Sequence, residues 1–109
     1  MNVRLYILQR GTAALMVPLI AVHLAVIFYA TRHQLSAEDI LARTRNSATW
    51  ALFYGTFVVA ASIHAAIGVR NVLTEWSGLS GRMSGLLGFL FGAMLLALGL
   101  RAVAAVVLP

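Results

Sequence analysis

The sequence contains no cysteine and no lysine, and it carries few charges of either sign. Without cysteine the chain has no disulfide, no thiolate nucleophile and no cysteine ligand for an iron–sulfur cluster. Charged residues make up 10% of the chain, and three of them are acidic: Glu38, Asp39 and Glu75. None of these carboxylates lies inside a long apolar segment, so the chain lacks the membrane-embedded acidic residue that is typical of small transporters and channels.

Hydrophobic residues dominate what remains, at 61% of the 109 residues. This share and the mean hydropathy of +0.92 are far above those of a soluble domain. Three segments run for 18 to 20 residues without a charge: 11–30, 50–69 and 83–100. At ~1.5 Å per residue, a helix of this length covers most or all of the ~30 Å hydrocarbon core of a bilayer.

The sequence therefore predicts an all-α, integral, multi-pass membrane protein. We expect a single transmembrane domain over residues 1–109, a bundle of three helices at about 9–31, 47–74 and 83–108. A cleaved signal peptide is the alternative for the first segment. Twenty apolar residues are long for its hydrophobic region, however, and no small-x-small cleavage motif precedes the polar loop.

The connections between the segments also carry patterns. Ser36 and Asp39 have the spacing of a capping box, which predicts a short amphipathic turn on the membrane surface. Residues 74–82 form a short connection rich in glycine and serine, so the second and third helices should be antiparallel neighbours. Gly88 and Gly92 form a GxxxG pair on the third segment, which lets another helix approach closely.

All eight basic residues are arginines, and the formal net charge is +5. They flank the apolar segments, where arginine anchors are expected, so the charge indicates contact with the lipid bilayer and no nucleic acid. Four arginines fall on each side of the predicted bundle, which leaves the orientation unassigned by charge alone. Arginine forks pair well with carboxylates or lipid phosphates.

Two histidines, His23 and His64, lie inside the apolar segments, where an imidazole must find a partner for its ring nitrogens. His23 lies ~4 Å beyond the middle of its segment and His64 ~7 Å beyond the middle of an antiparallel one, so their depths should differ by roughly 11 Å. One iron cannot take both as facing axial ligands, so they indicate two separate sites.

Small residues surround His64 and leave room for a large flat ligand: Ala60, Ala61, Ala65 and Gly68. The alternative is that these residues mark a helix contact and that His64 forms a hydrogen bond to a neighbouring helix.

The segment from Ser62 to Trp76, S-I-H-A-A-I-G-V-R-N-V-L-T-E-W, resembles the second helix of the membrane-anchor (cytochrome b) subunits of succinate dehydrogenase, the succinate:quinone oxidoreductase of respiratory complex II. That helix has the pattern His-x-x-x-Gly-hydrophobic-Arg/Trp, followed by an acidic and an aromatic residue. The resemblance implies that His64 is an axial ligand of haem b and that Glu75 and Trp76 lie near the quinone. Trp76 replaces a tyrosine, and its indole N–H would then replace the phenolic donor.

The first apolar segment carries a second resemblance. Gln9-Arg10-Gly-Thr12-Ala, followed by an apolar run to His23, resembles the first helix of dihaem anchors in related fumarate reductases. This implies that His23 ligates a distal haem and that the chain is half of a two-chain anchor. Arg32 and Arg101 would then pair with the propionates of that haem. A quinone pocket is expected at the N-terminal end of the bundle, formed by Gln9, Arg10, Thr12, Arg70, Glu75 and Trp76.

The resemblance implies a subunit of a succinate dehydrogenase/fumarate reductase complex that itself has no flavin or dicarboxylate site. It would dock the flavoprotein and iron–sulfur subunits at its N-terminal side, hold one or two haems b beside a second anchor subunit or a second copy, and pass electrons to ubiquinone or menaquinone. The bacterial cytoplasmic membrane is the expected location. A cofactor-free anchor or assembly subunit with structural histidines remains the main alternative. The direction of the reaction and the side of the quinone stay open.

Overall fold

Four α-helices make up residues 2–109, the part of the chain that the computed structural model describes. They are α1 (Val3–Arg32), α2 (Ala37–Thr44), α3 (Ala48–Trp76) and α4 (Gly81–Val107). Three of them, α1, α3 and α4, are long and apolar enough to cross a membrane. The predicted all-α bundle of three transmembrane helices is confirmed.

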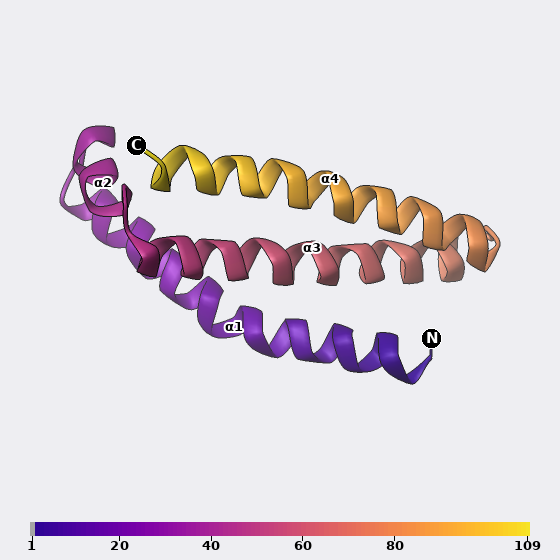
Figure 1. The fold of residues 1–109 in the computed structure, drawn as a ribbon. Coiled ribbons are helices and arrows are strands. Elements are labelled where there is room, and N and C mark those ends of the chain that lie inside the picture. The colour runs from indigo at the N-terminus through magenta and orange to yellow at the C-terminus, as the bar shows by residue number, and fades with distance from the viewer. Residues whose placement is uncertain (1) are drawn as a thin grey trace.

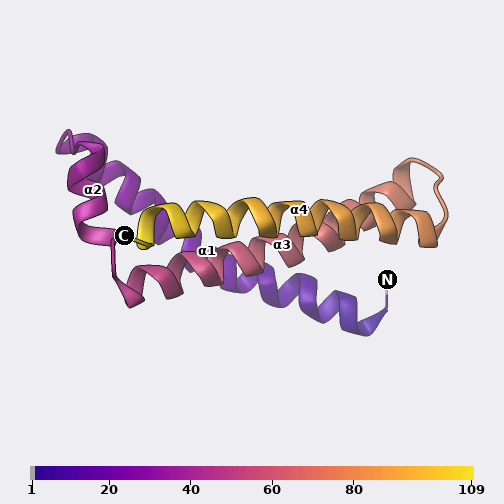
Figure 2. The ribbon, with the colours of Figure 1, turned by 45° about the horizontal axis from the view of Figure 1, so that its top comes forward.

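The central helix of the bundle is α3, which packs against both α1 and α4. Figures 1 and 2 show α3 and α4 running antiparallel side by side, whereas α1 crosses α3 obliquely. We call the end with residues 2 and 77–80 the near end, and the end with α2 and residue 109 the far end. The predicted adjacency of the second and third membrane helices is confirmed.

The predicted start of the first helix, near residue 9, is wrong. The helix begins at Val3, because the Asn2 side chain accepts a hydrogen bond of 2.9 Å from the Leu5 amide and caps the first turn. The other long helices begin and end within two residues of the predicted limits, at Ala48–Trp76 and Gly81–Val107. At its near end α1 is therefore longer than predicted.

The short helix α2 begins with the predicted capping box. Ser36 Oγ accepts from the Asp39 amide at 3.1 Å, and the Asp39 carboxylate accepts from the Ser36 amide at 3.0 Å. These hydrogen bonds lower the pKa of Asp39 from its ordinary value.

After α2, the chain is bonded to the end of α4. Thr44 donates from its hydroxyl to the Val106 carbonyl at 2.6 Å, and the Asn46 amide donates to the Val107 carbonyl at 2.7 Å. These bonds satisfy two carbonyls in the last turn of α4, which have no helical partner of their own. They also hold α2 at the far end of the α3–α4 pair.

Glycines on α4 allow its backbone to approach α3 closely. A Cβ atom added at Gly88 would lie 2.5 Å from the Ala66 carbonyl oxygen, and one at Gly92 would lie 2.7 Å from the Ala66 Cβ. Real Cβ atoms do not make contacts this short, so glycine is required for the observed packing. The predicted GxxxG contact is confirmed, and the helix that packs against these glycines is α3 of the same chain.

We predict that Gly88→Ala destabilises the bundle by about 1–3 kcal/mol, because the new methyl group must push α3 and α4 apart. Unfolding in detergent micelles, followed by circular dichroism, measures the change. Gly11→Ala is the matched control, since an added Cβ there meets no atom within 4 Å. Equal stability of the two variants would show that the helices do not meet at Gly88 as described.

Candidate functional site

His64 lies on α3 and makes a polar contact with α1. Its Nδ1 atom lies 3.1 Å from the hydroxyl oxygen of Thr12. Thr12 is buried, with 8% of its surface exposed, and its hydroxyl also lies 2.7 Å from the Leu8 carbonyl oxygen and 3.1 Å from that of Gln9. The Thr12–His64 contact sets the level at which α1 meets α3. It involves Nδ1, so the other ring nitrogen of His64, Nε2, takes no part in it.

An open groove of about 340 Å³ lies beside His64. It is lined by residues of α3 alone: His64, Ala65, Gly68, Val69, Val72 and Leu73. Two of the four small residues near His64, Ala65 and Gly68, therefore line this groove. The other two do not, because Ala60 is buried in the bundle with 3% exposed and Ala61 lines a different cavity.

Gln9 reaches α3 near the same groove. A Cβ atom added at Gly68, one of the residues lining the groove, would lie 3.5 Å from the Gln9 amide nitrogen. The amide oxygen of Gln9 is buried and has no hydrogen-bond partner among the described residues. A buried amide oxygen without a partner is unfavourable in an apolar setting.

The remaining near-end candidates lie on other surfaces. Arg70 is half-buried and packs over α4, where its Nε atom would lie 3.5 Å from a Cβ added at Gly85. Arg10 is exposed, with its guanidinium carbon 5.8 Å from the centre of the Tyr6 ring. Glu75 and Trp76 are also exposed, Trp76 to 83%. Thr12 and Gln9 thus meet α3 near His64, whereas the other four predicted quinone residues lie apart from that contact.

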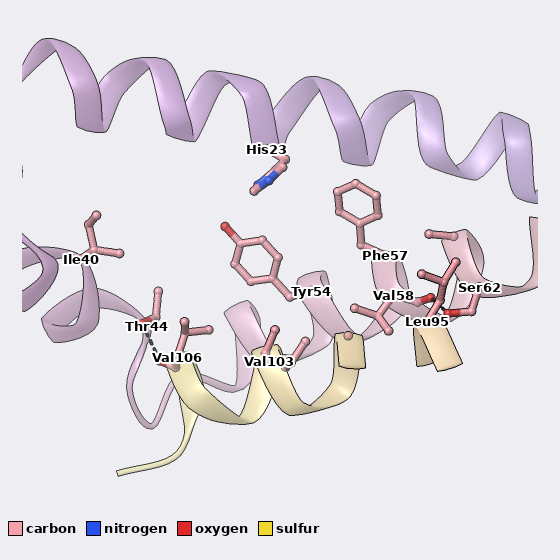
Figure 3. Close-up of a pocket in the computed structure, with 13 residues that line it drawn as sticks. His23, Ile40, Thr44, Tyr54, Phe57, Val58, Ser62, Leu95, Val103 and Val106 are labelled. Atoms are coloured by element: carbon pink, nitrogen blue, oxygen red, sulfur yellow. Dashed lines mark hydrogen bonds between the residues drawn. The ribbon is translucent and has the colours of Figure 1, made fainter. Parts of the chain in front are cut away.

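His23 faces a cavity of about 480 Å³ that all four helices line, in the half of the bundle nearer the far end. Figure 3 shows its ring projecting from α1 toward the Tyr54 hydroxyl. The ring meets Tyr54 and Phe57 edge-on, with centroids 5.6 and 5.7 Å apart. Its Nδ1 atom is buried and has no hydrogen-bond partner among residues 2–109. The cavity therefore combines largely apolar walls with an imidazole whose Nδ1 is unpaired.

Tyr54 lines this cavity but is not among the site residues predicted from the sequence. A pattern that predicts its position is present, since four aromatic residues follow the i, i+3, i+4, i+7 spacing of one helix face: Trp50, Phe53, Tyr54 and Phe57. Their rings contact one another along α3. The aromatic face meets His23 because α1 crosses α3 at that level.

The two arginines predicted to accompany His23 do not line this cavity. Arg32 is exposed, and its guanidinium carbon lies 5.5 Å from the centre of the Phe28 ring. Arg101 is exposed on α4, next to Ala102, which does line the cavity. Their role toward a haem propionate stays a prediction.

The two intramembrane histidines lie at different levels, as the sequence indicated. Thr12 marks the level of His64 on α1, and His23 follows it by 11 residues, or roughly 16 Å of helix. In the part of the chain that the structure describes, no three His, Asp or Glu side chains gather into a group that could hold a metal ion. A metal bound at either level would take a single histidine from this chain.

Comparison with known proteins assigns the family. The model of the succinate dehydrogenase/fumarate reductase transmembrane subunit matches residues 1–100, which extends beyond the region 9–76 that carries the sequence resemblance. Searches of curated proteins and of solved structures gave no significant match. With three apolar helices of membrane-spanning length and a match over most of its residues, the chain belongs to the family of succinate dehydrogenase/fumarate reductase transmembrane subunits.

Proposed function

We propose that this chain is a haem b-binding membrane anchor of a succinate:quinone oxidoreductase. In this role it docks the flavoprotein and iron–sulfur subunits and takes part in electron transfer to quinone, in a bacterial cytoplasmic membrane. Family membership supports one part of this proposal, that the chain is a membrane subunit of the complex. The observation that carries the haem proposal is the position of His64 between Thr12 and an open groove.

The surroundings of His64 have the features that a haem ligand needs. A ligating imidazole uses one ring nitrogen for the metal, and its other nitrogen is held by a hydrogen bond. Thr12 supplies that bond to Nδ1, and Ala65 and Gly68 leave space in the groove for a flat group. Bound here, haem b would supply a one-electron carrier with both axial positions filled.

The second axial ligand would come from another chain. Residues of a single helix, α3, line the groove at His64, which leaves its opposite wall to a second anchor subunit or a second copy of this chain. His23 cannot serve as that ligand, because it lies roughly 16 Å further along α1.

We further propose that His23 ligates a second, distal haem. Its buried Nδ1 has no partner among the described residues, and the adjoining cavity of about 480 Å³ is large enough for a sizeable part of a cofactor. The competing proposal, a cofactor-free anchor, also has an observation in its favour. The Thr12–His64 contact is the interhelical hydrogen bond that such an anchor would use.

The quinone pocket is proposed at the near end, where the chain would meet the iron–sulfur subunit. A quinone carbonyl needs hydrogen-bond donors at an apolar surface. Arg10 and Trp76 offer such donors and are exposed in this chain, so a docked subunit would form the rest of the pocket.

Replacing His64 tests the haem ligand. In the intact complex, His64→Ala should remove the low-spin b haem or convert it to a high-spin form that binds carbon monoxide, because one axial ligand is lost. Reduced-minus-oxidised absorption spectra detect either change. His33→Ala is the control, since His33 is exposed beyond the end of α1. A low-spin spectrum that survives in His64→Ala would rule out this ligand.

Replacing the exposed donors tests the quinone pocket. Arg10→Leu combined with Trp76→Leu should raise the KM for quinone about tenfold, the effect of losing ~1.4 kcal/mol of hydrogen bonding. Succinate oxidation with a soluble dye should not change. Arg82→Leu is the control, because it removes the same charge from an exposed near-end position. Unaltered quinone kinetics in the double variant would place the pocket elsewhere.

Counting haems tests the role of His23. The ratio of haem to flavin in the intact complex should be near two, and His23→Ala should lower it to one while the His64 haem remains. Pyridine haemochrome spectra and flavin fluorescence provide the two quantities. A ratio near one in the unaltered complex would leave His23 without a haem.

A further inference from the structure

We propose that Thr12 is a positioning residue that holds His64 in the tautomer protonated at Nδ1, so that the lone pair of Nε2 is free for a ligand. The proton assignment concerns the protein alone, whereas its use in holding a haem rests on the proposed function. Thr12 was expected among the quinone residues, and this assignment gives it a different task.

The tautomer follows from the single proton of the threonine hydroxyl. A hydroxyl donates one hydrogen bond and accepts up to two, whereas a carbonyl oxygen accepts only. The Thr12 oxygen lies 2.7 Å from the Leu8 carbonyl oxygen and 3.1 Å from His64 Nδ1. The shorter distance is typical of an O–H···O bond, and the longer one lies within the range of an N–H···O bond. The hydroxyl proton therefore goes to Leu8, and His64 Nδ1 carries the proton that it donates to Thr12.

The acceptor is also held in place. Thr12 is buried, its β-branched side chain has few rotamers, and its hydroxyl is anchored to a carbonyl one turn earlier on α1. A fixed acceptor orients the imidazole plane as well as its proton. With Nδ1 committed to α1, Nε2 is the ring nitrogen left for a ligand.

The tautomer can be measured without haem. We would record ¹⁵N NMR spectra of the haem-free full chain in detergent micelles, with His64 assigned through His64→Gln. The expected result is a protonated Nδ1 and an unprotonated Nε2. Thr12→Val, which has nearly the same shape and no hydroxyl, should shift His64 to the Nε2-protonated form, and Thr12→Ser should restore the original one.

Two results would overturn the assignment. One is a His64 that is protonated at Nε2 in the unaltered chain, and the other is a Thr12→Val variant in which His64 keeps the tautomer of the unaltered chain. The first measurement needs no Thr12 variant, so it decides the question even if Thr12→Val does not fold.

The intact complex tests the use of this tautomer. An imidazole that donates a hydrogen bond is a stronger electron donor to iron, so Thr12→Val should shift the midpoint potential of the His64 haem to a more positive value. Thr12→Ser should keep the original potential. An unchanged potential in Thr12→Val would contradict the positioning role. A complex without haem would contradict the proposed function and leave the NMR assignment standing.

Discussion

The site of this protein depends on one hydrogen bond in an apolar environment, between Thr12 on α1 and His64 on α3. Apolar contacts between helices in a bilayer give little directional preference, because lipid tails offer an equivalent environment. A polar contact between two specific side chains sets the level of one helix against the other. With Thr12 opposite His64, the later turns of α1 bring His23 to Tyr54 and Phe57.

The second constraint is the close approach of α3 and α4. Gly88 and Gly92 bring these helices together along their length, whereas α1 crosses α3 obliquely and packs little against α4. The Thr44 hydroxyl attaches α2 to the last turn of α4 at the far end. Residues of all four helices line the cavity beside His23, which their side chains do not fill.

Much of this arrangement could be predicted from local patterns. Uncharged segments of bilayer length predict the helices, Ser36 and Asp39 predict the cap of α2, and the different levels of the histidines follow from helix rise. Two features depend on packing between distant residues. The cavity at Tyr54 requires the crossing angle of α1, and the hydroxyl of Thr12 meets an imidazole 52 residues away. The start of α1 was missed because the Asn2 cap precedes residues that carry no further start signal.

The central claim is that this family member holds haem b at His64, in contrast to a cofactor-free anchor. The most direct test is the reduced-minus-oxidised absorption spectrum of the purified complex that contains this chain. The account predicts the sharp bands of a low-spin b-type cytochrome, because both axial positions of the iron are filled. A complex that oxidises succinate with quinone and shows no b-type band would contradict it.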